Sequence, residues 1–187
     1  MKILSKVARA MILSTGLLMA SSYSVDNAHS NVGFTVKHMM VTNVHGKFTS
    51  YDAKVEFDDA TKTFKKLVAN IDTNSIDTGI EKRDNHLRSD DFFAVEKFPK
   101  MTFEMTSYKA DGNDGKMTGN LTIRGITKPV VLEVEDISML GDGVGFSLEG
   151  EIDRQDFDLK WNKAIELGGV AVSDEVKIKV DIEAKKQ

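Results

Sequence analysis

Apolar and polar residues alternate along most of the chain, and this alternation predicts β-strands with one buried face. Eight separate runs show it, each bounded by polar or turn-forming residues. The residues that share the apolar face are Val32, Phe34, Val36 and His38; Ala53, Val55 and Phe57; Leu67, Ala69 and Ile71; Met101, Phe103 and Met105; Met117, Gly119, Leu121 and Ile123; Val130, Leu132 and Val134; Val144, Phe146, Leu148, Gly150 and Ile152; and Val176, Ile178, Val180 and Ile182.

Short turn sequences separate several of these runs. Asp111–Gly115 and Gly141–Gly143 contain the Gly and Asn residues that tight hairpins use, and Gly125–Pro129 is a third short link. Consecutive hairpins predict an antiparallel meander, and a meander of eight strands removes its exposed edges by closing into a barrel. We therefore expect an all-β fold, an eight-stranded antiparallel barrel.

Two segments interrupt the strand pattern. Between Ser75 and Phe98 the apolar residues Ile76, Ile80 and Leu87 fall at helical spacing, so we predict a short helix around residues 79–88. The second irregular segment is Asp153–Gly169, between the last two strands. Insertions of this size between barrel strands are typical of a cover over one mouth or of part of a site.

The apolar faces of the strands would line the barrel interior. An eight-stranded barrel is just wide enough to be filled by its own side chains or to hold one small ligand. The inward positions of Met101, Met105 and Met117 suit an adaptable apolar wall, and Ala69, Gly119 and Gly150 are small where a filled core would use bulk. These residues favour a cavity for a hydrophobic molecule over a packed core.

The first residues have the anatomy of an export signal. Lys2, Lys6 and Arg9 precede the apolar stretch Ala10–Met19, and Ala20–Ser22 supplies small residues for cleavage. The stretch is shorter than the roughly 20 residues of a spanning helix. We predict a signal peptide over residues 1–22, a single lipid-binding β-barrel domain over residues 23–187, and export to the periplasm.

Charge and cysteine content narrow the function further. The chain has 29 acidic and 25 basic side chains, so it offers no general attraction to nucleic acid or to an anionic membrane, and direct membrane insertion is not expected. It has no cysteine, which excludes disulfides, thiol catalysis and cysteine-based zinc sites.

Four ordered motifs resemble the YceI-like family. They span almost the whole chain after the predicted signal, and the charged irregular segment is the most recognisable of them. The motifs are Val25–His38 followed by Gly46–Phe48; Thr78–Phe93 followed by Lys97–Pro99; Gly119–Val130; and Arg154–Leu159 with Trp161. One departure stands out, since Asp158 occupies a position where glycine is common in the family.

The resemblance implies a lipocalin-like barrel that holds an isoprenoid or another long-chain amphiphile lengthwise in its lumen. It also implies export and a tendency to form dimers. The motifs leave the ligand open among an isoprenoid, an isoprenoid quinone and a fatty-acid derivative. No cofactor is expected besides this bound lipid.

Candidate ligand-binding residues come from the inward faces and the two irregular segments. They are Phe34, Val36, His38, Arg83, His86, Leu87, Phe92, Phe93, Met101, Phe103, Met105, Leu121, Ile123, Leu132, Phe146, Leu148, Phe157 and Trp161. Arg83 and His86 could bind the polar head of the ligand at the barrel mouth, or Arg83 could pair with a nearby aspartate and anchor the helix. Phe157 and Trp161 could contact the far end of the ligand or plug the barrel.

Other kinds of chemistry have little support in the sequence. The four histidines lack the tight spacing of zinc ligands, so no metal site is expected. The chain has no Gly-x-Ser-x-Gly elbow and no phosphate-binding loop, and the pair Asp90 and Asp91 is typical of solvated surface. A lipid-binding protein is the favoured interpretation, with a structural or stress-related dimeric module and an enzyme acting on isoprenoid or acyl lipids as alternatives.

Overall fold

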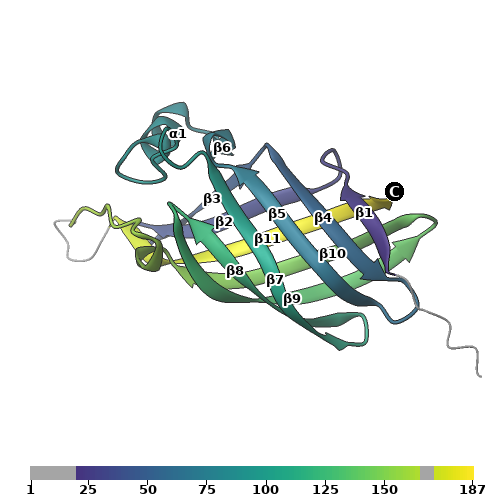
Figure 1. The fold of residues 1–187 in the computed structure, drawn as a ribbon. Helices are drawn as coiled ribbons and strands as arrows, with labels where there is room; N and C mark the ends of the chain where they lie inside the picture. Colours follow the sequence, from purple (N-terminus) through teal and green to yellow (C-terminus); the bar gives the residue numbers. More distant parts are fainter. Residues whose placement is uncertain (1–19, 165–170) are drawn as a thin grey trace, which may run out of the picture.

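Eight strands close into an antiparallel barrel in the computed structural model, which describes residues 20–164 and 171–187 (Figure 1). Each strand of the ring pairs with the next, and the first strand closes the ring against the last. In ring order the strands are β1 (Ser21–Val25), β4 (Tyr51–Asp58), β5 (Thr63–Asp72), β7 (Lys100–Asp111), β8 (Asp114–Ile123), β9 (Ile126–Leu140), β10 (Gly143–Asp153) and β11 (Val172–Lys186).

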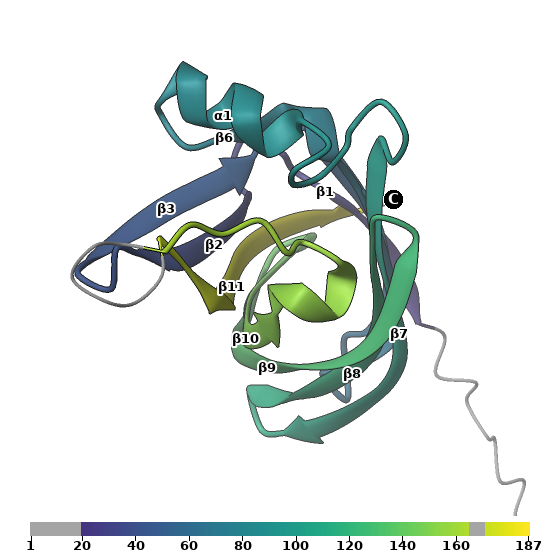
Figure 2. The same ribbon diagram turned by 90° about the vertical axis from the view of Figure 1, so that its left-hand side faces the viewer.

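Three further strands form a leaf that branches from this ring. The leaf consists of β2 (Asn31–His38), β3 (Thr42–Phe48) and the short β6 (Ile76–Asp77). It arises because one edge of β11 is divided between two partners. Residues 184–186 pair with β1, whereas the longer stretch from Val172 to Asp181 pairs with β2. Figure 2 shows the hairpin of β2 and β3 projecting away from the ring.

Tight turns connect the strands at what we call the closed end of the barrel. The β4–β5, β7–β8 and β9–β10 hairpins turn there, and Lys62 of the first donates to Asn113 of the second. The opposite end, which we call the mouth end, carries the β8–β9 turn. There Arg124 and Gly125 both have positive φ, as the favoured two-residue hairpin turns require.

The irregular segments gather at the mouth end, as Figures 1 and 2 show. One contains the 3₁₀ turn η1 (Thr73–Ser75), strand β6 and helix α1 (Glu81–Arg88). The other begins with the 3₁₀ turn η2 (Arg154–Phe157), which lies across the opening of the barrel in Figure 2. Both segments were expected either to cover a mouth or to form part of a site, and the predicted helix is confirmed.

Aromatic side chains fill the barrel at its closed end. The ring of Phe64 packs edge-on against Phe57, Tyr108 and Phe146, with ring centroids 4.8–5.1 Å apart. The interior here is solid because large side chains from strands far apart in sequence meet across it. The side chains that are at most 2% exposed at this end include Tyr23, Phe57, Phe64, Met117, Val134, Ile137, Val144 and Ala184.

The predicted all-β antiparallel barrel of eight strands is confirmed, but its strand inventory differs. Residues 32–38 were counted in the ring and belong to the branching leaf instead. The ring is completed by β1, which the alternation did not identify, and β3 and β6 were also missed. No helix in the described residues is long and apolar enough to cross a membrane. The predicted signal lies almost entirely outside them, although Ser21 and Ser22 belong to β1.

Candidate functional site

The mouth half of the barrel encloses an apolar cavity of about 190 Å³. Every strand of the ring contributes residues to its wall. The wall presents no polar surface to the interior. A space of this size with apolar walls holds no ordered water, because water needs two to four polar partners. The cavity therefore suits a hydrophobic occupant.

Most of the candidate residues lie in this wall. They come from five strands and from the segment around α1, and Phe92, Met101, Phe103 and Leu121 are each less than 10% exposed. The candidates that line the cavity are Phe34, Val36, Leu87, Phe92, Phe93, Met101, Phe103, Leu121, Ile123, Leu132, Phe146 and Leu148.

The wall also contains side chains that were not among the candidates. Twelve of the twenty belong to the inward faces of the predicted strands, so the alternation did contain their signal. They are Val25, Val32, Phe48, Tyr51, Ala53, Val55, Leu67, Ala69, Ile71, Val130, Ile152, Leu159, Val172, Val176, Ile178, Val180 and Ile182, together with Gly33, Asp52 and Arg154.

Two candidates from inward strand faces, His38 and Met105, lie away from the cavity, and so does Phe157 from the second irregular segment. His38 is exposed at the outer end of β2, where the leaf has left the barrel. The prediction that it points inward is therefore wrong. Met105 precedes a register shift in β7 and does not reach the cavity wall. Phe157 is 1% exposed and packs in the core as part of η2, which agrees with the plug alternative.

The small residues expected to leave room do so only in part. A Cβ atom at Gly119 would lie 2.3 Å from the ring of Phe103, and one at Gly150 would lie 2.5 Å from Leu132. The larger neighbour thus covers each glycine, and the space is filled rather than open. Ala69, in contrast, lines the cavity. Methionine forms little of the cavity wall. Met117 is buried in the closed end, and only Met101 of the three inward methionines reaches the wall.

An aromatic cluster covers the mouth. The imidazole of His86 lies edge-on to Phe92 and to Trp161, with ring centroids 5.1 and 4.8 Å apart. Phe92 and Trp161 approach each other at 5.3 Å, and Asp91 contacts His86 Nε2 at 2.8 Å. Phe92 reaches the cavity, whereas His86 and Trp161 lie outside it. The cluster joins the two irregular segments above the opening.

Arg83 anchors the helix, which was one of its two predicted roles, but its partner is Thr78 and not an aspartate. Its side chain donates to the hydroxyl and the carbonyl oxygen of Thr78, at 2.7 and 2.8 Å. The buried carboxylate of Asp84 accepts from the amide of the same threonine. These contacts fix the start of α1, so Arg83 does not face the cavity.

A second arginine, Arg124, holds the loop that carries Phe92. From the β8–β9 turn its guanidinium donates to the carbonyl oxygens of Asp90 and Phe92, and it lies 3.7 Å from the carboxylate of Asp158. Lys160 and Arg124 together hold the pKa of Asp158 below its usual range. Asp158 has φ of 59°, a left-handed conformation that glycine adopts without strain, which accounts for the glycine common at this position.

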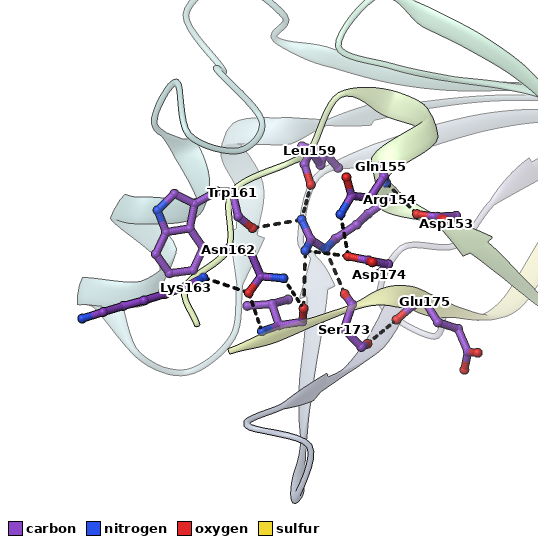
Figure 3. A network of polar contacts seen from close by, with 11 residues as sticks. Asp153, Arg154, Gln155, Leu159, Trp161, Asn162, Lys163, Ser173, Asp174 and Glu175 are labelled. Atoms are coloured by element: carbon purple, nitrogen blue, oxygen red, sulfur yellow. Dashed lines mark hydrogen bonds and ion pairs between the residues drawn. The ribbon is translucent and has the colours of Figure 1, made fainter. Parts of the chain in front are cut away.

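Figure 3 shows how a third arginine holds the segment that carries Trp161. Arg154 is 3% exposed and donates to the carbonyl oxygens of Ser173, Leu159 and Trp161. It also contacts the carboxylate of Asp174 at 3.0 Å. Burial lowers the pKa of Arg154 and Asp174 opposes that effect, so the guanidinium stays charged. Neither Arg124 nor Arg154 was singled out as a candidate, although both lie in the quoted motifs.

Among the residues that the structure describes, the remaining polar groups do not form a second site. Asp26, His29 and Glu183 lie close enough to hold a cation, but the ammonium group of Lys185 already contacts Asp26 at 2.6 Å. Asp90 pairs with Lys97, and Asp91 pairs with His86.

Comparison with known proteins agrees with this arrangement. Residues 23–184 match the YceI-like domain. Protein YceI of Salmonella newport is 36% identical over 185 residues, which cover 95% of this chain and 94% of that protein. The crystal structure of the Campylobacter jejuni YCEI protein is 42% identical and covers 87% of this chain and 96% of its own, with a TM-score of 0.71.

Two further solved structures share the fold. Burkholderia cenocepacia BcnA is 28% identical with a TM-score of 0.76, and the match covers 85% of this chain and 98% of that one. A polyisoprenoid binding domain from Saccharophagus degradans is 17% identical with a TM-score of 0.63, covering 90% and 99%, a likeness of fold alone. The family match over nearly the whole length, together with the barrel, shows that the chain belongs to the YceI-like family.

Proposed function

We propose that this protein binds one long-chain apolar lipid in its barrel and carries or buffers that lipid in the periplasm. The observation that supports the proposal most directly is the apolar cavity in the mouth half of the barrel. Burial of each methylene group contributes about 0.8 kcal/mol, so a chain can bind firmly without polar contacts. An isoprenoid, an isoprenoid quinone and a fatty-acyl derivative all fit this chemistry.

The closed end of the barrel favours one orientation of the lipid. The aromatic packing around Phe64 blocks that end, so a chain can enter only from the mouth. The polar head would then lie at the mouth, near His86 and Asp91. The fold likeness to a polyisoprenoid binding domain is consistent with such a ligand.

The alternatives fit the described residues less well. A structural module with a filled core would bring Phe34, Phe103 and Phe146 together, yet all three line the cavity. An enzyme would need polar groups that converge on one end of the ligand, and the cavity wall formed by the described residues presents none. Pairing of two copies of the chain stays a prediction.

Native mass spectrometry of protein purified from the periplasm without detergent tests the proposal. We expect a stoichiometric apolar species that organic extraction releases and identifies. Protein at its bare mass that also failed to take up added isoprenoid and fatty-acyl lipids would contradict lipid binding and favour the structural module.

A matched pair of variants links the lipid to the cavity. Ala69→Phe places a ring in the cavity and should lower the amount of bound lipid while the barrel stays folded. Val68→Phe, on the adjacent position of β5 outside the cavity wall, is the control and should bind as the wild type does. Leu121→Arg buries a charge in the wall and should abolish lipid retention. Equal lipid content in all these proteins would exclude the cavity as the binding site.

A further inference from the structure

The cavity ends partway along the barrel, and we call the place where it ends its floor. On β10, Phe146 lines the cavity, whereas Val144, two residues nearer the closed end, is 1% exposed and does not line it. The same change occurs on β4 between Val55, which lines the cavity, and Phe57, which is fully buried. Every strand of the ring has lining residues toward the mouth end and none beyond the floor, so the interior changes there from open to packed.

Phe146 belongs both to the cavity wall and to the packing beneath the floor. Its ring lies edge-on to Phe64, with centroids 4.8 Å apart, and Phe64 packs in turn against Phe57 and Tyr108. Of these four rings, only that of Phe146 lines the cavity. Because the rings behind it are closely packed, Phe146 cannot retreat toward the closed end. Ile182 of β11, which pairs in register with Phe146, also lines the cavity and lies beside it.

The depth of the cavity above this floor is limited. The six residue steps on β10 from Ile152, near the mouth end, to Phe146 correspond to about 15 Å along the barrel, from a rise of about 3.3 Å and a tilt of about 40°. The wall that the described residues form presents no polar group along this depth, so nothing holds a chain at an intermediate position. An apolar chain is stabilised by each methylene that it buries, and it therefore advances until its end meets the floor.

We propose that Phe146 determines how many carbons of a lipid chain the barrel buries, and that the protein thereby selects its ligand by chain length. A chain that is too short to reach Phe146 leaves part of the cavity empty and loses the contacts of the deepest wall. A chain that is longer than the cavity leaves its remaining carbons at the mouth, where they add no burial. The inference rests on the proposed lipid binding, with the head of the lipid at the mouth and its tail inward.

The test is the affinity of the purified protein, stripped of bound lipid, for saturated fatty acids and for linear prenyl alcohols of increasing length, measured by titration calorimetry. For the wild type we expect the affinity for fatty acids to rise about fourfold with each added methylene and then to stop rising at one chain length. Phe146→Ala leaves an apolar space that stays dry, and it should move this limit to chains roughly two to four carbons longer. Ile182→Phe adds a ring at the floor and should move the limit to shorter chains. Should Phe146→Ala not fold, Ile182→Phe alone tests the floor.

Phe103→Ala is the matched control. Phe103 also lines the cavity, but it lies near the mouth end of β7, so the same truncation should change the affinity for every chain by a similar factor and leave the limit in place. A limit that stays at the wild-type length in both floor variants, or that moves as far in Phe103→Ala, would overturn the inference. An affinity that rises through the whole series without a limit would also overturn it, although lipid binding itself would then stand. Wild-type protein that binds neither series would contradict the proposed function and the inference with it.

Discussion

The ring of Phe103 lies over Gly119, on the neighbouring strand, so closely that it occupies the place of a side chain. A Cβ atom at Gly119 would lie 2.3 Å from Phe103 Cζ and 2.7 Å from the carbonyl oxygen of Glu104. The second contact is with backbone and cannot relax by a change of rotamer. Because Gly119 has no side chain, the Phe103 ring can lie against this position instead of projecting further into the cavity.

Replacement of Gly119 by Ala should push the Phe103 ring inward. We expect a loss of about 1–3 kcal/mol in the free energy of unfolding, typical of overpacking, and a smaller amount of bound lipid. Urea denaturation and lipid extraction measure the two effects. Gly145→Ala is the control, since its nearest neighbour is the Ser138 hydroxyl at 3.2 Å, which can rotate away. A Gly119→Ala protein as stable as this control would contradict the packing argument.

Arg124→Ala should release the loop over the cavity. The side chain holds the carbonyl oxygens of Asp90 and Phe92, and hydrogen bonds to a charged group contribute about 1.5–3 kcal/mol. We expect faster release of bound lipid, with the rest of the barrel unchanged. Stopped-flow dilution with the fluorescence of Trp161, the single tryptophan, follows that release. Arg124→Lys keeps the charge without the planar fork and should restore only part of the effect; full restoration would show that charge alone is needed.

Arg154→Ala should be the more damaging change. Its guanidinium is buried and satisfies the carbonyl oxygens of Leu159 and Trp161, which would lose their donor. We expect a loss of about 3–5 kcal/mol in the free energy of unfolding, and early hydrogen exchange in residues 158–164. Thermal denaturation and exchange mass spectrometry test these outcomes. The exposed Lys160→Ala is the comparison, because its ion pair with Asp158 lies in solvent.

The environment of Tyr23 predicts that the folded state loses stability in alkali. Its hydroxyl donates a 2.7 Å hydrogen bond to Asp59, and burial together with this carboxylate raises the pKa of Tyr23 to about 12. An unfolded tyrosine titrates near pH 10. The neutral phenol therefore stabilises the folded state fully below pH 10, and this contribution is lost as the pH rises toward 12.

The variant Tyr23→Phe separates this effect from other alkaline changes. It should be less stable than the wild type at neutral pH, and the difference should shrink between pH 10 and pH 12. Burial also raises the pKa of Tyr51 and Tyr108, so the remaining slope will not be zero. Urea midpoints measured across this range provide the check. A constant difference at every pH would show that the Tyr23 hydroxyl is not linked to stability.

Alternation predicted the inward faces well, because the two-residue period of a strand is a local property. Phe103, Leu121 and Phe146 all line the cavity as expected. The depth of the cavity could not be predicted in this way. It depends on Phe64 meeting Phe57 and Phe146 across the barrel, and such contacts join residues far apart in sequence.

The branching of the leaf from the ring could not be predicted from the sequence, for physical reasons. Alternation identified Val32–Val36 as a strand but could not show that it shares an edge of β11 with β1. β1 begins within the predicted signal and has serines in place of regular apolar positions. The roles of Arg124 and Arg154 depend on carbonyl groups that turn toward them only in the folded loops, so the residue type alone gave no signal.

The divided edge of β11 has a consequence for the order of folding. The C-terminal strand is the partner of β10, β1 and β2, and Tyr23 pairs with Lys186 near the other end of the chain. Neither the ring nor the leaf can be completed before this strand is in place, so closure brings together segments of very large sequence separation. Such contacts slow folding. Until they form, β10 and β2 each present an open edge on which another unfinished chain can add.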